Sequence, residues 1–186
     1  MTPYPTEQGF YTHDTHGWER SIDVPCCRLR GDYADYAVMR RHFCYVDEAG
    51  AVGLARIGFP YNGANIPLLV RPLVGSPWKR HFDISAIHDS DCAQAAALPP
   101  GPERNSARMA ADVRLLSALR FNRTRWSTQQ AWFRGVRVGA LCSARSAQGI
   151  DYTTDLEAYY AALGLSGVFN WVNERVIRHS YDDEGN

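Results

Sequence analysis

The apolar pattern of this chain changes its period once, and this change limits the folds that are open to it. From Tyr33 to Ile57, apolar and polar residues alternate with a period of two, which predicts strands. A turn signal, Asp47-Glu48-Ala49-Gly50, divides this stretch, so we expect a hairpin. After the loop GFPYNGANIP at 58–67, apolar residues recur at helical spacing. The chain is therefore predicted to be α+β, with an N-terminal β-hairpin or small sheet followed by a helical body.

Helix start and stop signals divide this body. The predicted helices cover residues 82–98, 106–121, 127–142, 154–164 and a stretch that begins at Ser166. Asp83 caps the first helix and Pro99-Pro100 ends it, while Thr154 and Glu157 form a capping box for the fourth. Only the loop 99–105 separates the first two helices, so we expect them to pack as an antiparallel pair.

Composition divides the chain into three parts. Residues 1–32 show little periodicity and are expected to form an extended arm; residues 33–142 form the predicted core domain, and residues 143–186 form a C-terminal helical extension with a polar tail. The segment HDTH at 13–16 fits either a flexible metal site or an exposed polar turn. The five cysteines contain no CxxC pair, so we expect buried thiols rather than a structural zinc site.

Charge and hydropathy exclude several classes of function. The chain has 20 basic and 20 acidic residues, so its formal net charge is zero and direct nucleic-acid binding is not expected. No run approaches the roughly 18 apolar residues of a membrane span. The start MTPYPTEQGF lacks the features of a secretory signal, so we expect a chain made in the cytoplasm. Basic residues gather between 61 and 150, which indicates internal pairing or an anionic partner.

A histidine and an aspartate on the predicted helix pair are the strongest candidates for chemistry. Asp112 falls within the apolar stripe that Met109 and Val113 mark on the second helix. A carboxylate facing a core needs a partner, because burying it alone costs several kcal/mol. His88, on the apolar face of the first helix, can meet it. If Asp112 holds one imidazole nitrogen, the other is left as a general base. The same contact also fits a structural pair that only fixes helix register.

A cation site is expected beside this pair. Asp89 follows His88 and points about 100° around the helix, toward a different ligand. The preceding loop offers the Asn62 side chain and the Gly63 carbonyl, and such oxygen donors suit Ca²⁺ better than Zn²⁺. A water polarised by the metal and deprotonated by His88 would be a hydrolytic nucleophile. An HD-type metal phosphohydrolase would instead need further His and Asp ligands on an all-helical body.

Four segments resemble a known family in their order and spacing: GFPYNGANIP (58–67), SAIHDSDC (85–92), MAADVRLL (109–116) and AWFRGVRVGA (131–140). Together they resemble domain of unknown function 1353, a family of tailed phages and prophages, over roughly residues 55–141. The helix pair is in turn similar to phospholipase A2 of the parvoviral capsid type. That resemblance implies His88 as base, Asp89 as calcium ligand and Asp112 as the residue that orients the imidazole. Asn62 stands where the family has Asp, and Asp91-Cys92 stands where it has Leu-Tyr, so calcium should bind more weakly.

Two functions follow from the resemblance. The first is a virion component, tail- or baseplate-associated, made in the bacterial host cytoplasm and held by other virion proteins in a multi-chain assembly. The second is a calcium-dependent hydrolase of phospholipid or another cell-envelope ester. For the hydrolase, an exposed aromatic such as Trp78 or Trp126 would help it meet a membrane, although both residues are expected to cover the core.

Overall fold

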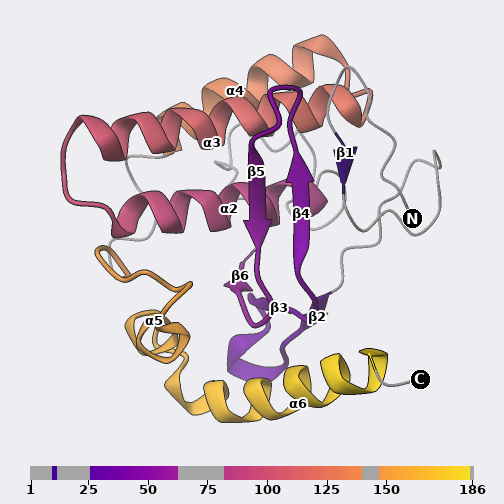
Figure 1. Cartoon of the computed structure of the whole chain (residues 1–186), viewed down its shortest axis with the longest axis vertical. Coiled ribbons are helices and arrows are strands. Elements are labelled where there is room, and N and C mark those ends of the chain that lie inside the picture. Colours follow the sequence, from indigo (N-terminus) through magenta and orange to yellow (C-terminus); the bar gives the residue numbers. More distant parts are fainter. Residues whose placement is uncertain (1–9, 12–25, 63–81, 140–146, 185–186) are drawn as a thin grey trace.

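The computed structural model describes residues 10–11, 26–62, 82–139 and 147–184. The fold is α+β, as predicted: small antiparallel sheets come first and helices follow (Figure 1). The strands are β1 (Phe10–Tyr11), β2 (Cys26–Arg28), β3 (Ala37–Met39), β4 (Phe43–Val46), β5 (Val52–Ala55) and β6 (Pro60–Tyr61). The helices are η1 (Gly31–Tyr33), α2 (Phe82–Ala97), α3 (Pro102–Phe121), α4 (Trp126–Gly139), α5 (Leu156–Ala162) and α6 (Ser166–Glu184).

The predicted hairpin is confirmed as β4 and β5. The two strands pair antiparallel, with Tyr45 opposite Gly53. The Asp47 carboxylate accepts from the backbone N–H groups of Ala49 (2.9 Å) and Ala51 (2.8 Å), and Gly50 takes a positive φ of 81°. A short polar side chain and a glycine thus close the turn at the place the sequence indicated.

The alternating stretch before this turn is two strands in two sheets rather than one continuous strand. β1, β4 and β5 form one sheet, and β2, β3 and β6 form the other, with the chain crossing between them at residues 40–42. All three residues of β3 are buried, because adjacent side chains enter different cores: Ala37 and Met39 enter one, and Val38 enters the other. The described parts of the predicted N-terminal arm, β1 and β2, are hydrogen-bonded members of these sheets.

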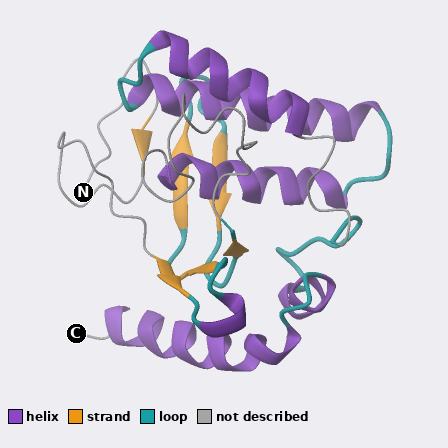
Figure 2. Ribbon diagram, turned by 180° about the vertical axis from the view of Figure 1, so that it is seen from behind, coloured by secondary structure: helices purple, strands orange, loops and turns teal. Residues whose placement is uncertain are grey.

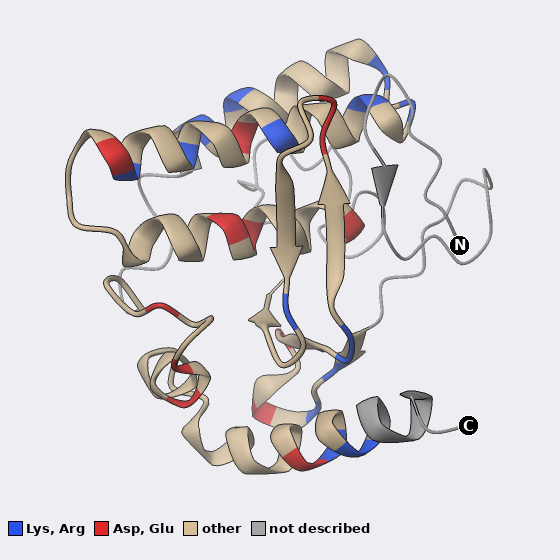
Figure 3. Cartoon of the chain, in the orientation of Figure 1, with Lys and Arg blue, Asp and Glu red and all other residues tan. Residues whose placement is uncertain are grey.

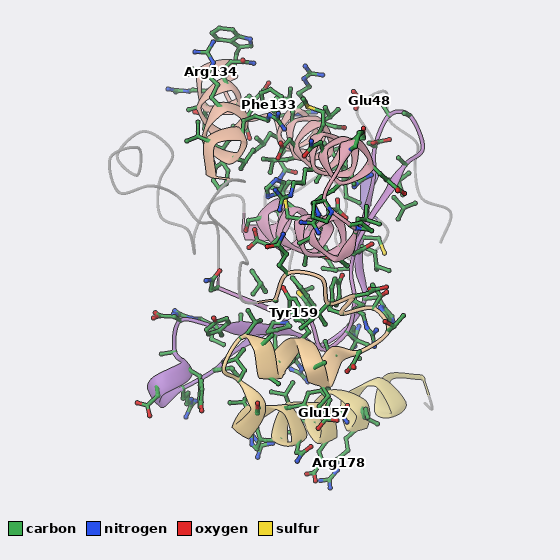
Figure 4. The ribbon with its side chains drawn as sticks, turned by 90° about the vertical axis from the view of Figure 1, so that its left-hand side faces the viewer. Glu48, Phe133, Arg134, Glu157, Tyr159 and Arg178 are labelled. Atoms are coloured by element: carbon green, nitrogen blue, oxygen red, sulfur yellow. The ribbon has the colours of Figure 1, made fainter. Side chains whose placement is uncertain are left out.

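Two apolar cores share β3. The larger core lies between the β4–β5 hairpin, α2 and α3, and it includes stacked and tilted rings of Phe59, Tyr152 and Tyr159. The smaller core packs α5 and α6 against β2 and β3. α3 and α4 therefore lie at one end of the molecule and α6 at the other, as both ribbon views show (Figures 1 and 2). In the side view, Phe133 and Arg134 of α4 and Arg178 of α6 mark these two ends (Figure 4).

α2 is the central helix, and it is nearly buried on all sides between the hairpin and α3. Its polar side chains therefore need partners. The Ser90 hydroxyl donates to the Leu54 carbonyl, and Gln94 donates to the Tyr152 hydroxyl at 3.3 Å. Gly53 lets β5 approach the helix closely, since a Cβ there would lie 2.6 Å from the Ile87 side chain. This close packing fixes the position of the residues that α2 carries.

Several details of the helices differ from the sequence prediction, among them two caps: Asp83 lies inside the first turn of α2, and Asp155 rather than Thr154 caps α5. α3 begins at Pro102, earlier than expected, because proline is compatible with the first helical position. The apolar stripe predicted for α3 was wrong at Met109 and Val113, which are 42% and 49% exposed, and right at Leu119, which is buried. The buried face instead consists of smaller and neighbouring residues, among them Ala111, Leu115 and Ala118, with Asp112 beside them. α4 begins one residue early at Trp126, which is 72% exposed and does not cover the core.

Candidate functional site

The predicted contact between His88 and Asp112 is present. His88 Nε2 lies 2.8 Å from Asp112 Oδ1, across the interface of α2 and α3. The Asp112 side chain is completely buried and that of His88 nearly so. The short connection between the two helices makes them antiparallel neighbours, which brings residues 24 positions apart into contact.

Arg137 of α4 is a third member that the sequence reasoning did not assign. Its Nη1 donates to Asp112 Oδ2 at 2.9 Å, so each oxygen of this carboxylate has its own charged or polar partner. The Arg137 side chain is 40% exposed, and it therefore links the buried carboxylate to the protein surface. The available signal was its place in AWFRGVRVGA, one of the segments in which the sequence resembles the phage family.

The other imidazole nitrogen faces Asp89. His88 Nδ1 lies 3.8 Å from Asp89 Oδ1, and a quarter of the Asp89 side chain is exposed. Nε2 is thus occupied by Asp112, whereas Nδ1 lies toward a partly accessible carboxylate. One carboxylate therefore orients the ring, as in a catalytic triad, and a second carboxylate lies beside the opposite nitrogen.

The charges of this cluster shift its pKa values in opposed ways. Burial lowers the pKa of His88, but the neighbouring Cys92, Asp112 and Asp89 outweigh it and raise that pKa well above its ordinary value. Burial raises the pKa of Asp89, and His88 opposes that rise. The imidazole of His88 therefore tends to carry a proton on both nitrogens. A cation bound beside Asp89 would lower the pKa of His88 and favour the loss of one of these protons.

Cys92 is a second residue that the sequence reasoning left aside. It lies one helical turn after His88, and its Sγ is 3.6 Å from His88 Nε2. The ligand atoms of His88, Cys92 and Asp112 all lie within 4.8 Å of one another. The spacing of four residues on a helix was the available signal, because it places two side chains on one face.

The predicted calcium ligands are only partly described. Asp89 is at the site, and Asn62 is exposed directly after β6. The structure gives no contact between the two, but Asp89 lies near the end of that strand: the pKa of Tyr61 is raised mainly by burial and Cys26, and also by Asp89. Gly63 lies outside the described residues. The donors fit a hard cation in kind, because both are oxygen ligands, and the calcium set remains a prediction.

A second ion pair lies on the hairpin side of α2. Arg114 of α3 donates to Asp91 and also lies 3.8 Å from Asp47 in the turn of the hairpin. Burial raises the pKa of Asp91 to about 6, and Arg114 opposes that rise. Asp91 thus points toward β5, whereas its neighbours on the helix, His88 and Cys92, point toward Asp112.

Arginines lie along α3 and α4, at one end of the molecule (Figure 3). Arg114, Arg120 and Arg137 pair with acidic residues. Arg123 and Arg125, in the corner between α3 and α4, are exposed, and their guanidinium groups form no hydrogen bond or ion pair with any residue that the structure describes. The basic middle of the chain is therefore partly internal pairing and partly free surface charge.

The chain matches no family model, no curated protein and no solved structure. The resemblance to the phage family and to phospholipase A2 therefore stays a prediction based on motifs. Within the described ranges, no helix has the length and apolar character of a membrane span.

Proposed function

We propose that the chain is a hydrolase of phospholipid or another cell-envelope ester, with His88 as its general base. The observation that carries this proposal is the division of the imidazole: Asp112 occupies Nε2 at 2.8 Å, and Nδ1 faces Asp89. The contact with Asp112 keeps the imidazole ring in one orientation and leaves Nδ1 as the nitrogen that can accept and release a proton.

In the proposed reaction, neutral His88 takes a proton from water at Nδ1 while the water oxygen bonds to the ester carbonyl carbon. The ester C–O bond then breaks, and the same nitrogen returns the proton to the departing alkoxide. Asp112 accepts from Nε2–H throughout and stabilises the imidazolium that forms in between. Arg137 holds the second oxygen of Asp112 and so fixes the carboxylate against rotation.

Asp89 is the residue that would hold calcium, with Asn62 and the Gly63 carbonyl as further ligands from the preceding loop. Calcium at this place would supply positive charge to the ester carbonyl. The Asp89 carboxylate is partly accessible and, among the described residues, its charged neighbour is His88 at 3.8 Å. These features support a cation there rather than a closed ion pair.

The corner between α3 and α4 supports an anionic membrane as the substrate surface. Trp126 is 72% exposed, and Arg123 and Arg125 flank it with free positive charge. The corner lies at the N-terminal end of α2, five residues before His88, because Asn122 donates to Asp83 at 2.7 Å in the first turn of that helix. An indole and two guanidinium groups suit the interface of a bilayer that contains acidic lipids.

The second candidate is a structural or accessory virion component, associated with a tail or baseplate, in which the His88–Asp112 pair only fixes helix register. One observation favours it: the raised pKa of His88 makes the imidazolium the favoured form, and that form pairs with Asp112 but cannot accept a proton. Other virion proteins would then cover the exposed corner in place of lipid. In both candidates we infer, from the motif resemblance, that the chain is made in the bacterial host cytoplasm and assembled into a virion.

The test is fatty-acid release from phosphatidylglycerol vesicles, measured by mass spectrometry with calcium and with EGTA. The variants are His88→Gln and Asp112→Asn, with Asp35→Asn as the matched control because Asp35 is exposed in the turn between η1 and β3. Loss of a general base should lower the rate by about 10²–10⁴-fold, whereas the control keeps its rate. Calcium-independent release would exclude the calcium ligands from this mechanism, whereas equal rates in wild type and His88→Gln would exclude His88 as the base and favour the structural candidate.

A further inference from the structure

We propose that His88, Cys92 and Asp112 form a binding site for a transition-metal ion, with Zn²⁺ as the ion that suits it. This site does not depend on the hydrolase proposal, because it requires three ligand atoms and no reaction. It uses the thiol at position 92, which neither the base nor the calcium ligands involve.

Two elements bring the ligands together. His88 and Cys92 lie four residues apart on α2 and therefore on one face of the helix, and Asp112 faces them from α3. Asp112 is completely buried, and His88 is buried as well. A buried helix pair holds its side chains in fixed rotamers, so the three groups are positioned before any ion arrives.

The distances are close to those of a tetrahedral zinc site. Zinc binds His nitrogen at about 2.0–2.1 Å, thiolate at about 2.3 Å and carboxylate oxygen at about 2.0–2.2 Å. Tetrahedral angles then place nitrogen and sulfur about 3.6 Å apart and nitrogen and oxygen about 3.4 Å apart. The structure has 3.6 Å between His88 Nε2 and Cys92 Sγ, and 2.8 Å between Nε2 and Asp112 Oδ1. The second distance must open by about 0.6 Å when zinc replaces the shared proton, and the third, between Cys92 Sγ and the Asp112 carboxylate, is no longer than 4.8 Å.

Outer partners of the ligands are also in place. In metal sites, the second nitrogen of a ligating histidine is usually held by a carboxylate or carbonyl group. Here Asp89 Oδ1 lies 3.8 Å from His88 Nδ1, and Arg137 holds the oxygen of Asp112 that zinc would not use. The thiolate and the carboxylate neutralise the charge of the ion, and Asp89 and Arg137 balance each other.

The donor set selects the ion. A thiolate and an imidazole favour zinc, whereas calcium takes oxygen ligands in larger number. Within the described part of the chain, these three residues are the one cluster of three or more His, Cys, Asp or Glu side chains that could hold a metal ion. Three protein ligands leave the fourth position of a tetrahedral ion to water. Zinc would use the nitrogen that otherwise carries the proton shared with Asp112, so zinc should inhibit any reaction in which His88 is the base.

Cobalt absorption tests this site without any substrate. Reduced, metal-free protein is titrated with Co²⁺, and a thiolate-to-cobalt charge-transfer band is expected at one ion per chain, displaced by Zn²⁺. The band should be lost in Cys92→Ser and retained in Cys44→Ser, a matched control because Cys44 is also a partly buried free thiol. Asp89→Asn should keep the band but weaken binding by about 10–100-fold.

A wild-type chain without the band, or a Cys92→Ser chain that retains it, overturns the proposal. If Cys92→Ser does not fold, protection of wild-type Cys92 from iodoacetamide by Zn²⁺, mapped by mass spectrometry, decides the same question: protection supports the site and its absence overturns it. Because the spectrum needs no turnover, failure here leaves the hydrolase proposal intact, and an inactive chain that binds cobalt leaves the zinc site intact.

Discussion

The substitution Gly53→Ala tests the packing on which the site depends. A Cβ at position 53 would lie 2.6 Å from Ile87 Cγ2, 2.7 Å from Arg114 Cδ and 2.9 Å from Asp91 Oδ2. Ile87 is buried in the larger core, and Arg114 and Asp91 are joined in an ion pair. None of the three neighbours can withdraw alone, so β5 and α2 must separate or the pair must break.

The expected cost follows from this crowding. Extra methyl groups in a well-packed core destabilise by about 1–3 kcal/mol. In a chain of this size, each kcal/mol lowers the melting temperature by roughly 2–4 °C. A loss near the middle of both ranges, about 2 kcal/mol and about 6 °C, is therefore expected for Gly53→Ala.

Thermal and urea unfolding, followed by circular dichroism, measure this loss. The matched control is Gly135→Ala in α4, where an added Cβ meets nothing within 4 Å. Alanine is a better helix former than glycine, so the control should gain about 0.5–1 kcal/mol. The two variants make the same chemical change and should move stability in opposite directions.

An unchanged or raised melting temperature in Gly53→Ala would refute the reasoning. It would mean that β5 does not pack as closely on α2 as the structure has it. The position of His88 relative to the hairpin would then have to be reconsidered, because the same helix carries both contacts.

Three further predictions concern single contacts. Asp155 accepts from the Ala158 N–H at 2.9 Å at the start of α5, so Asp155→Ala should cost about 1 kcal/mol in urea unfolding, and no loss would mean that this cap is not formed. The pKa of Asp91 is raised to about 6, so between about pH 4 and 6 the folded state holds a proton that the unfolded state has lost. The stabilising effect of this proton is present below pH 4 and is lost as the pH rises through 6. Relative to Asp91→Asn, the free energy of unfolding should therefore fall by about 3 kcal/mol over this range. The opposite slope would mean that the pair with Arg114 outweighs burial. Trp126→Ala should weaken sedimentation with phosphatidylglycerol vesicles by about tenfold while leaving the melting temperature unchanged, and equal sedimentation would exclude the corner as a lipid contact.

The fold class followed from the sequence because its signals are local. The hairpin turn depends on Asp47 and Gly50, and α2 ends before Pro99. The division of the predicted strand into β3 and β4 could not be found in this way. Its cause is that β3 is buried on both faces, which depends on α6, more than 100 residues later in the chain. An alternating pattern indicates a strand with one buried face, so periodicity alone cannot identify a strand that is buried on both faces between two cores.

The error in the α3 stripe has a related cause. Met109 and Val113 are the larger apolar residues, and hydrophobicity alone ranks them as core. Alanines at 111 and 118 are buried instead, and small side chains of this kind let packed helices approach closely. Asp112 was nevertheless placed correctly, since it borders both the expected and the observed stripe. Its second partner, Arg137, depends on how α4 packs on α3, which no local pattern specifies.

The three interpretations of this cluster can be separated only by residues that are not shared between them. Asp112 belongs to the base, to the zinc site and to the structural pair, so its loss would change all three and break a buried contact that is worth about 3–5 kcal/mol. Asp89 and Cys92 differ, because neither takes part in the 2.8 Å contact between His88 and Asp112. Asp89→Asn removes the calcium carboxylate and keeps all three zinc ligands, whereas Cys92→Ser removes a zinc ligand and keeps the calcium carboxylate. A stable chain that loses calcium-dependent hydrolysis but keeps the cobalt band in the first variant, and loses only cobalt binding in the second, would have both sites around one imidazole. A stable chain in which neither change affects hydrolysis or cobalt binding would use that imidazole to hold its helices together.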